Sequence, residues 1–286
     1  MKEIKKVCVV GAGQMGKQIA LNTAIHGYET YLTDSVADAV SAAEKWAKEY
    51  LQKRIAKGKM DEATAKAASE HFHPVVDMES ALKGSDLVIE CIIEKEDAKR
   101  ELFKKVDQIV DADTILATNS SNMPSSTFAK DISHPERLAN LHYFNPALVM
   151  ELTEVVQGPH TSDETIEALM DFSTKTGKSP IHLKKEIPGF VCNNILAAIK
   201  DKALYLVEEG ICTPQEVDTA VEKGLNYPMG PFRLMDMTGL DLSYYTAKAK
   251  SDKGEKVYGL DLLEEKYKAH EWGRKTGKGW YDYTSK

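Results

Sequence analysis

His142 and Glu154 are the two side chains of this 286-residue chain whose types and spacing most strongly suggest proton chemistry. They flank an Asn-Pro turn in the segment LHYFNPALVMELTEVV. If the second half of this segment is a strand, alternate residues face one side, and Glu154 shares that side with the apolar residues Met150, Leu152 and Val156. Because an unpaired buried carboxylate is strongly unfavourable, Glu154 needs a partner, and the turn could bring it back beside His142.

A histidine paired with a buried carboxylate is suited to acid–base catalysis. The carboxylate would fix the imidazole tautomer and stabilise the charged ring. His142 could then take a proton from a hydroxyl group or return it to a carbonyl oxygen. A His–Glu pair with a purely structural role is the alternative interpretation.

A glycine-rich segment near the N-terminus predicts a dinucleotide site. It follows an apolar run and opens a helical pattern, and its residues are Gly11, Ala12, Gly13, Gln14, Met15 and Gly16. The first glycine would permit a tight turn, the second a close approach of the pyrophosphate, and the third close packing of helix on strand. Asp34 ends the next strand-like run, where a carboxylate can bind the adenine ribose and repel a 2′-phosphate. The pattern favours NAD over NADP, and a glycine turn without a dinucleotide is the alternative.

Alternating strand and helix patterns would position these residues. Strand-like runs lie at 4–10, 29–34, 86–90, 113–118, 137–142, 151–157 and 179–183. Helical patterns lie at 14–26, 36–57, 61–71, 95–109 and 124–130. This order predicts an α/β fold, a Rossmann-like doubly wound and mostly parallel sheet with helices on both faces. No strand pattern follows Pro188-Gly189, so we predict an NAD-binding domain over 1–186 and an all-helical C-terminal domain over 187–286.

Polar residues follow the predicted strand at 113–118, at the edge where ligands bind in such sheets. They are Asn119, Ser120, Ser121 and Asn122. Small hydrogen-bonding groups suit a polar substrate, but they suit an ordinary turn equally well.

Composition excludes several classes of function. A formal net charge of -7 argues against a nucleic-acid partner. The longest apolar runs fall short of the ~18–20 residues of a membrane span, so we expect no membrane partner. The 4 cysteines lack the spacing of a metal site and lie among apolar residues. They predict reduced packing residues in a cytoplasmic protein, with no bound metal.

Seven motifs together resemble the (S)-3-hydroxyacyl-CoA dehydrogenase family, and within it the bacterial 3-hydroxybutyryl-CoA dehydrogenases. They run in family order from residue 7 to 283: VCVVGAGQMG, DLVIECIIE, ATNSSNMP, LHYFNPALVMELTEVV, PGFVCNN, YPMGPFRLMDMTGLD and GRKTGKGWYDY. The resemblance implies NAD-dependent interconversion of 3-hydroxyacyl-CoA and 3-oxoacyl-CoA, with 3-hydroxybutyryl-CoA and acetoacetyl-CoA as the expected pair. It also implies a homodimer formed through the helical domain.

The resemblance assigns roles to individual residues of this chain. It implies that His142 and Glu154 are the catalytic pair. The residues that it places at the reacting centre are Ser121, Asn145 and Asn193. The cofactor contacts that it adds to the glycine loop and Asp34 are Glu94, Lys99, Ser121, Asn145 and Lys275. The substrate contacts that it implies are Ser121, Asn193 and, for the phosphates of coenzyme A, Lys57 in the basic segment 45–59, which could equally be a solvated helix face.

Four positions depart from the usual family residues. Asn122 stands where a second serine is common, and Leu148 where a proline is frequent. Asn194 replaces an arginine, and Arg233 replaces an acidic residue. These departures put acyl specificity in doubt more than the chemistry. Two alternatives stay open: an NAD-dependent dehydrogenase of a free hydroxy acid such as gulonate or carnitine, and a non-catalytic NAD-binding protein on the same scaffold.

Overall fold

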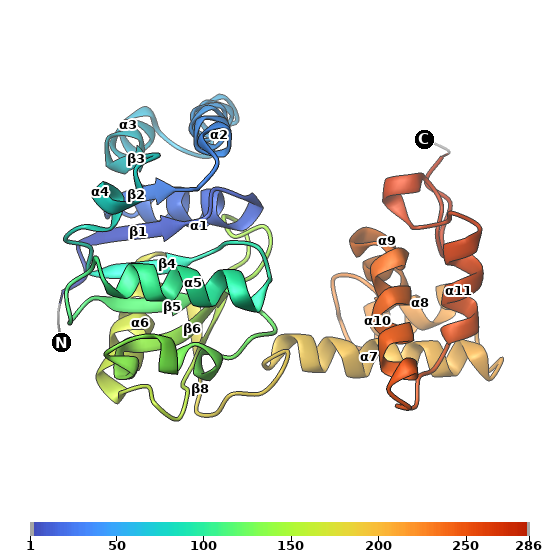
Figure 1. Ribbon diagram of the computed structural model, residues 1–286. Helices are drawn as coiled ribbons and strands as arrows, with labels where there is room; N and C mark the ends of the chain where they lie inside the picture. Colours follow the sequence, from blue (N-terminus) through green and yellow to red (C-terminus); the bar gives the residue numbers. More distant parts are fainter. Residues whose placement is uncertain (1–2, 285–286) are drawn as a thin grey trace. The chain divides into compact units, whose positions relative to one another are not determined.

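The computed structural model describes residues 3–284, which form two units, one ending at Val191 and the other beginning at Cys192. The first unit contains an eight-stranded sheet in the order β3-β2-β1-β4-β5-β6-β7-β8 (Figure 1). The strands are β1 Lys6–Val10, β2 Glu29–Thr33, β3 Phe72–Pro74, β4 Leu87–Glu90, β5 Ile115–Thr118, β6 Leu138–Tyr143, β7 Leu152–Val156 and β8 Ser179–Leu183. All neighbouring strands are parallel except β6 and β7.

Helices connect the strands of the first unit and make up the second. In the first unit they are α1 Gln14–Ile25, α2 Ala37–Ala56, α3 Glu62–His71, α4 Met78–Leu82, α5 Glu96–Asp107 and α6 Asp163–Lys175, with short 3-10 turns η1 Ser125–Thr127, η2 Ala129–Asp131 and η3 Pro135–Arg137. In the second they are α7 Cys192–Glu208, α8 Pro214–Gly224, α9 Pro231–Thr238, α10 Leu240–Asp252, α11 Leu260–Lys268 and the 3-10 turn η4 Arg274–Thr276. The predicted fold class, a doubly wound sheet with an all-helical C-terminal part, is confirmed.

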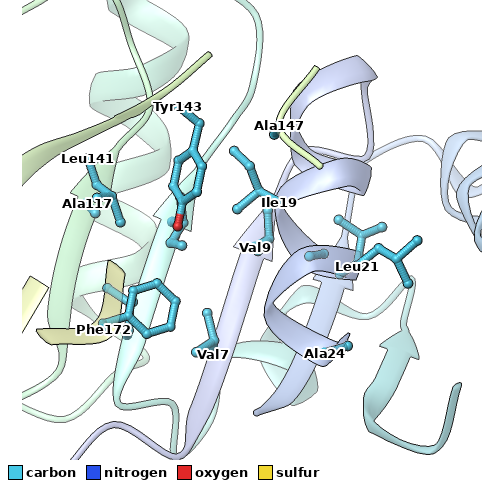
Figure 2. Close-up of a cluster of buried hydrophobic side chains, with 14 of the residues drawn as sticks. Val7, Val9, Ile19, Leu21, Ala24, Ala117, Leu141, Tyr143, Ala147 and Phe172 are labelled. Carbon is cyan, nitrogen blue, oxygen red and sulfur yellow. The ribbon is translucent and has the colours of Figure 1, made fainter. Parts of the chain in front are cut away.

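Two apolar cores cover the two faces of the sheet, because strand side chains alternate. Val7 and Val9 of β1 belong to the core that α1, α2, α3 and α6 complete, where Figure 2 shows Ile19 of α1 close to Val9. Cys8 and Val10 point into the opposite core, which α4 and α5 complete. Burying each such aliphatic side chain contributes roughly 1.5–3 kcal/mol to the free energy of folding. The two cores therefore determine which side of the sheet each strand residue faces.

The strand order places the polar segments along one edge of the sheet. From β1 the chain moves outward through β2 to β3, and then returns to β4 on the other side of β1. Open α/β sheets bind ligands outside the carboxyl ends of their strands at such a reversal. The glycine loop, Asp34 and the residues after β4, β5 and β6 all follow carboxyl ends of parallel strands.

The structure differs from the sequence-based expectation in four places. Strand β3 and helix α4 were not predicted; β3 has only three residues, includes a proline and pairs only with β2. The segment 124–130 forms the turns η1 and η2 instead of an α-helix. Met150 precedes β7 and is exposed, so the strand face that buries Glu154 begins at Leu152.

Two buried aspartates organise the helical unit. Asp218 of α8 accepts the backbone N–H groups of Phe232 and Arg233 at the start of α9. Asp236 of α9 accepts the backbone N–H groups of Trp280 and Tyr281 at 2.9 and 3.0 Å. These carboxylates therefore tie the C-terminal segment, including Lys275 in η4, to the helices before it.

Candidate active site

His142 and Glu154 form a direct cross-strand pair. In the antiparallel register of β6 and β7 the two residues are opposite each other, and His142 Nδ1 lies 2.8 Å from Glu154 Oε2. The histidine side chain is 8% exposed and that of Glu154 is 0% exposed. Because a carboxylate only accepts hydrogen bonds, Nδ1 carries the proton, and Nε2 of the neutral ring is left as an acceptor.

The surroundings of this pair hold both side chains in one orientation. The backbone N–H of Val191 donates to Glu154 Oε1 at 3.0 Å. The rings of Phe144 and Phe190 pack on the imidazole, with centroids at 4.6 and 5.5 Å. Glu154 thus accepts hydrogen bonds on both oxygens, and His142 is fixed by one hydrogen bond and two aromatic contacts.

The glycine loop has the geometry that a dinucleotide needs. Gly11 has φ +113, and a Cβ there would lie 2.5 Å from the carbonyl oxygen of Cys91. A Cβ at Gly16 would lie 1.7 Å from the carbonyl oxygen of Gly11, so α1 packs against the loop at a distance that only glycine permits. A Cβ at Gly13 would meet no atom of the described part of the chain within 4 Å, which leaves open space where a pyrophosphate would approach.

Asp34 lies beside this loop, immediately after β2. Its Oδ2 accepts the N–H of Ala12 at 2.7 Å, and its Oδ1 accepts the N–H of Val36 at 2.9 Å. The first turn of α1 has no side-chain cap, so its N–H groups are available to a phosphate. These residues fit NAD: a carboxylate for the ribose, and backbone donors for the pyrophosphate.

Cys91 packs underneath the glycine loop. Burial raises the pKa of its thiol well above the ordinary value of 9.0. All four cysteines of the chain are free thiols, and Cys91 is a packing residue rather than a nucleophile.

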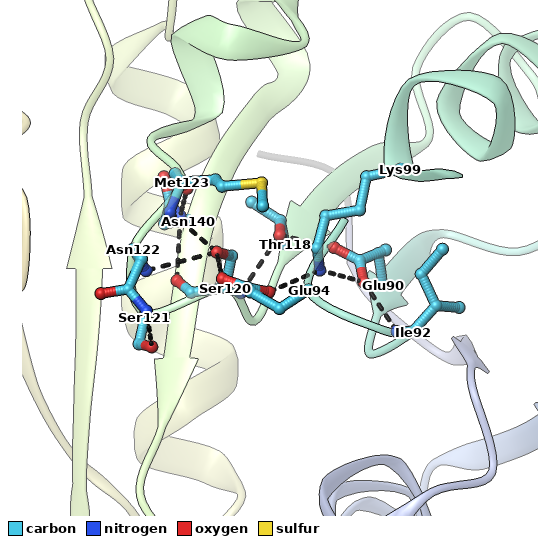
Figure 3. Close-up of polar contacts among 10 residues, drawn as sticks. All are labelled: Glu90, Ile92, Glu94, Lys99, Thr118, Ser120, Ser121, Asn122, Met123 and Asn140. Carbon is cyan, nitrogen blue, oxygen red and sulfur yellow. Dashed lines mark hydrogen bonds and ion pairs between the residues drawn. The ribbon is translucent and has the colours of Figure 1, made fainter. Parts of the chain in front are cut away.

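Glu94 and Lys99, both predicted cofactor contacts, belong to a buried polar network (Figure 3). The Lys99 side chain is 1% exposed, and its Nζ lies 2.6 Å from Glu90 Oε1 and 3.1 Å from Glu94 Oε2. Ser120 Oγ donates a short hydrogen bond to Glu94 Oε1. Glu94 is 40% exposed and is the member of the network that can reach a ligand.

The predicted polar loop after β5 is tied to β6. Asn119 Oδ1 accepts the N–H of Tyr143 at 2.9 Å. Buried Asn140 donates from Nδ2 to the carbonyl oxygens of Ser120 and Met123 at 3.3 and 2.9 Å. Ser121, the predicted substrate contact, accepts a hydrogen bond from Asn122 Nδ2 at 3.2 Å.

Sequence reasoning missed Glu90 and Asn140 as part of this site. Each is a polar residue within a strand whose other residues are mostly apolar. Asn140 lies two residues before His142 and therefore on the same face of β6. The alternation argument that identified Glu154 could have identified both.

The remaining predicted site residues are distributed over both units. Asn145 follows β6, and its Oδ1 accepts a hydrogen bond from Gln18 Nε2 at 3.4 Å. Lys57 is exposed immediately after α2. Asn193 lies in the first turn of α7, and Lys275 Nζ lies 2.5 Å from Asp241 Oδ2 within the helical unit.

Two family models cover nearly the whole chain. The 3-hydroxyacyl-CoA dehydrogenase NAD binding domain matches residues 6–187, and the C-terminal domain of the same family matches residues 189–283. The chain belongs to the 3-hydroxyacyl-CoA dehydrogenase family. The predictions of an NAD-dependent dehydrogenase and of NAD as its cofactor are thereby confirmed.

Three similar proteins align with this chain over 99% of its length. The chain is 37% identical to a protein of Bacillus subtilis named "Probable 3-hydroxybutyryl-CoA dehydrogenase", with 99% of each chain covered. The crystal structure of (S)-3-hydroxybutyryl-CoA dehydrogenase from Ralstonia eutropha superposes with a TM-score of 0.89 at 34% identity, covering 99% of this chain and 100% of that one. A diketoreductase described as acting on dicarbonyl compounds superposes with a TM-score of 0.89 at 31% identity and the same coverage.

Two features are absent from residues 3–284. No helix in this range is long and apolar enough to cross a membrane. No group of three or more His, Cys, Asp or Glu side chains in the same range could hold a metal ion.

Proposed function

We propose that this protein interconverts (S)-3-hydroxybutyryl-CoA and acetoacetyl-CoA, with His142 and Glu154 as the catalytic pair. The observation that carries the proposal is the 2.8 Å contact between His142 Nδ1 and the fully buried Glu154 carboxylate. NAD, when bound, supplies the redox chemistry by accepting or donating a hydride. The protein supplies the proton transfer that must accompany it.

In the oxidation direction, the neutral His142 ring accepts the 3-hydroxyl proton at Nε2. Glu154 keeps the other ring proton on Nδ1 and stabilises the positive charge that the ring then carries. In the reduction direction, the charged ring returns a proton to the 3-oxo oxygen. The two packed phenylalanine rings hold the imidazole plane while its charge changes.

The predicted substrate contacts are assigned on chemical grounds. The Ser121 hydroxyl accepts from Asn122, so its own hydrogen is available to a substrate oxygen. The amides of Asn145 and Asn193 can orient the reacting oxygen without competing for its proton. Lys57, exposed immediately after α2 in the basic segment 45–59, would meet a phosphate of coenzyme A.

The predicted cofactor contacts are assigned on the same grounds. Asp34 would accept hydrogen bonds from the adenine ribose, and the loop from Gly11 to Gly16 would hold the pyrophosphate. Glu94 would also contact the cofactor, with Lys99 fixing Glu94 from beneath. Lys275 is proposed as a cofactor contact on the family resemblance alone.

Steady-state kinetics with a series of 3-oxoacyl-CoA chain lengths tests this function. We expect NADH-dependent reduction with the highest kcat/KM for acetoacetyl-CoA, and weak activity with NADPH because Asp34 repels a 2′-phosphate. His142→Gln should lower kcat by at least about a hundredfold while NADH still binds. Near-normal turnover in that variant would contradict the catalytic assignment.

A reductase of free oxo compounds is the second candidate, favoured by the similarity to the diketoreductase. Comparing acetoacetyl-CoA with free 3-oxo acids and diketones separates the two functions. A higher kcat/KM for the free compounds would favour this candidate. The absence of NADH oxidation with every 3-oxo compound tested would instead favour a non-catalytic protein.

We further propose that the protein is a cytoplasmic homodimer joined through its helical unit. That unit exposes large apolar side chains, with Ile211, Leu225 and Leu242 each about 60% exposed. Large apolar side chains exposed on one unit support an interface there. A monomeric mass by light scattering at micromolar concentration would contradict the dimer.

A further inference from the structure

The loop that carries Ser121 is held by a hydroxyl group one residue earlier. Ser120 is 3% exposed, and its Oγ accepts the backbone N–H groups of Met123 at 2.9 Å and Asn122 at 3.3 Å. A hydroxyl has one hydrogen to donate, and here it is donated to Glu94 Oε1. The turn that presents Ser121 is thus built on the same oxygen that binds Glu94 (Figure 3).

The Glu94 carboxylate is in turn fixed by buried charge. Lys99 Nζ bridges Glu94 Oε2 and Glu90 Oε1. Glu90 is 1% exposed, accepts the Thr118 hydroxyl at 2.6 Å and accepts the N–H of Ile92 at 2.7 Å. A buried carboxylate with this many donors has one stable orientation, so Lys99 and Glu94 are anchored to the ends of β4 and β5.

The contacts form one continuous path between two functional groups. It starts at Glu90 and passes through Lys99, Glu94 and Ser120 to the turn containing Ser121. Glu94 is the predicted cofactor contact and Ser121 the predicted substrate contact. Ser120 is the only link in this path that belongs to the substrate loop.

We propose that Ser120 is a positioning residue: its hydrogen bond to Glu94 sets the position of the Ser121 hydroxyl relative to the cofactor site. This inference rests on the proposed function and deepens it. Ser120 has no contact with the reacting atoms in this scheme. Its effect is to make substrate binding depend on where the Glu94 carboxylate lies.

The loop has a second attachment that should preserve its fold when this bond is removed. Asn140 holds the carbonyl oxygens of Ser120 and Met123 and accepts the N–H of Ser125 at 2.7 Å. None of these bonds uses the Ser120 side chain. Ser120→Ala should therefore fold, with the loop still attached to β6 but no longer attached to Glu94.

The test measures the kinetics of Ser120→Ala with acetoacetyl-CoA and NADH. We expect KM for acetoacetyl-CoA to rise about tenfold, the effect of losing a hydrogen bond to a charged group, while the Kd of NADH changes less than about twofold. Ser120→Thr keeps the hydroxyl and should recover most of the wild-type KM. Ser173→Ala is the matched control, because Ser173 is a fully buried serine of α6 whose hydroxyl has no hydrogen-bond partner among residues 3–284.

A double-mutant cycle separates positioning from a general loss of stability. Glu94→Ala removes the acceptor of the same bond, so Ser120→Ala should raise KM for acetoacetyl-CoA no further in that background. Independent, multiplicative effects of the two changes would overturn the inference, as would an unchanged KM in Ser120→Ala. If Ser120→Ala does not fold, the comparison of Glu94→Ala with Glu94→Gln decides, because the amide keeps an acceptor oxygen and must give the lower KM.

The outcome for the wild-type protein distinguishes the two proposals. If wild type does not reduce acetoacetyl-CoA, the proposed function fails and the inference fails with it. If wild type is active and Ser120→Ala matches it in KM, only the positioning role of Ser120 is overturned.

Discussion

Replacing Glu154 with glutamine tests the catalytic pair with the smallest change, one oxygen and one charge in a fully buried side chain. Its two oxygens face two donors, His142 Nδ1 at 2.8 Å and the N–H of Val191 at 3.0 Å. An amide has one acceptor oxygen and one donor group. Glu154→Gln therefore cannot accept from both donors, and one of them must face an NH2 group.

The two orientations of the amide have different consequences. With the amide oxygen toward His142, the imidazole tautomer is kept but the negative charge beside it is lost, which should lower kcat about 10- to 150-fold. The Val191 N–H then has no acceptor at this side chain, which should cost about 1–3 kcal/mol of unfolding free energy. With its NH2 toward His142, the ring must carry its proton on Nε2 and can no longer accept one there. The equivalent Asp-to-Asn change in serine proteases lowers kcat about 10⁴-fold. If kcat falls only about 10- to 150-fold, the unfolding free energy should therefore fall as well. If kcat falls about 10⁴-fold, the unfolding free energy should stay near that of wild type.

The assay compares wild type, Glu154→Gln and the control Glu167→Gln, which makes the same change at an exposed residue of α6. It measures kcat for acetoacetyl-CoA reduction, the Kd of NADH and the urea midpoint of unfolding. We expect the control to match wild type in all three. A kcat for Glu154→Gln within about threefold of wild type, with unchanged NADH binding, would refute the catalytic role of the pair.

Three further predictions concern other residues. Asn122→Ser removes the amide that donates to Ser121 and should raise KM for acetoacetyl-CoA about two- to tenfold in steady-state kinetics. Asp236→Asn weakens a buried acceptor of backbone N–H groups and should lower the unfolding free energy by about 1.5–3 kcal/mol, measured by urea denaturation. Hydrogen bonds from His73 and His71 lower the pKa of Glu29 below its ordinary value of 4.5. The stabilisation that these bonds give the folded state is therefore present above pH 4.5 and is lost as the pH falls through the lowered pKa. Between about pH 5 and pH 3, wild type should therefore lose more unfolding free energy than Glu29→Gln.

Local patterns in the sequence predicted the sheet and the burial of Glu154, because period-two alternation depends only on strand geometry. The register that aligns Glu154 with His142 could not be obtained in this way. This register requires β7 to run antiparallel to β6. The direction of β7 is set by the turn before it and by packing against residues that are distant in the sequence. Strand β3 was missed for a related reason: Phe72–Pro74 is a strand only because it pairs with β2.

The glycine loop was predictable because each glycine has a separate local reason. A Cβ at Gly11 or Gly16 would lie within 3 Å of backbone atoms, and the missing Cβ of Gly13 leaves space for a ligand. Alternation could mark Glu90 as a buried polar residue, but its partners were not predictable. Thr118 and Ser120 lie 28 and 26 residues after Glu90 and Glu94, and they meet these glutamates only where β4 and β5 end. Lys99 was assigned to the cofactor through resemblance, and the structure shows that its Nζ faces two glutamates.

Three of the four departures from family residues differ in their contacts. Arg233 stacks on Tyr281 at 4.2 Å within the helical unit, so it is explained by packing of that unit. Leu148 packs against the core on the α1 face of the sheet, where an apolar side chain of either shape would serve. Asn122, by contrast, donates directly to Ser121, the residue expected to bind the substrate. Because serine has a shorter side chain and no amide group, it could not make this contact, and we expect any difference in acyl specificity from other family members to arise mainly at Asn122.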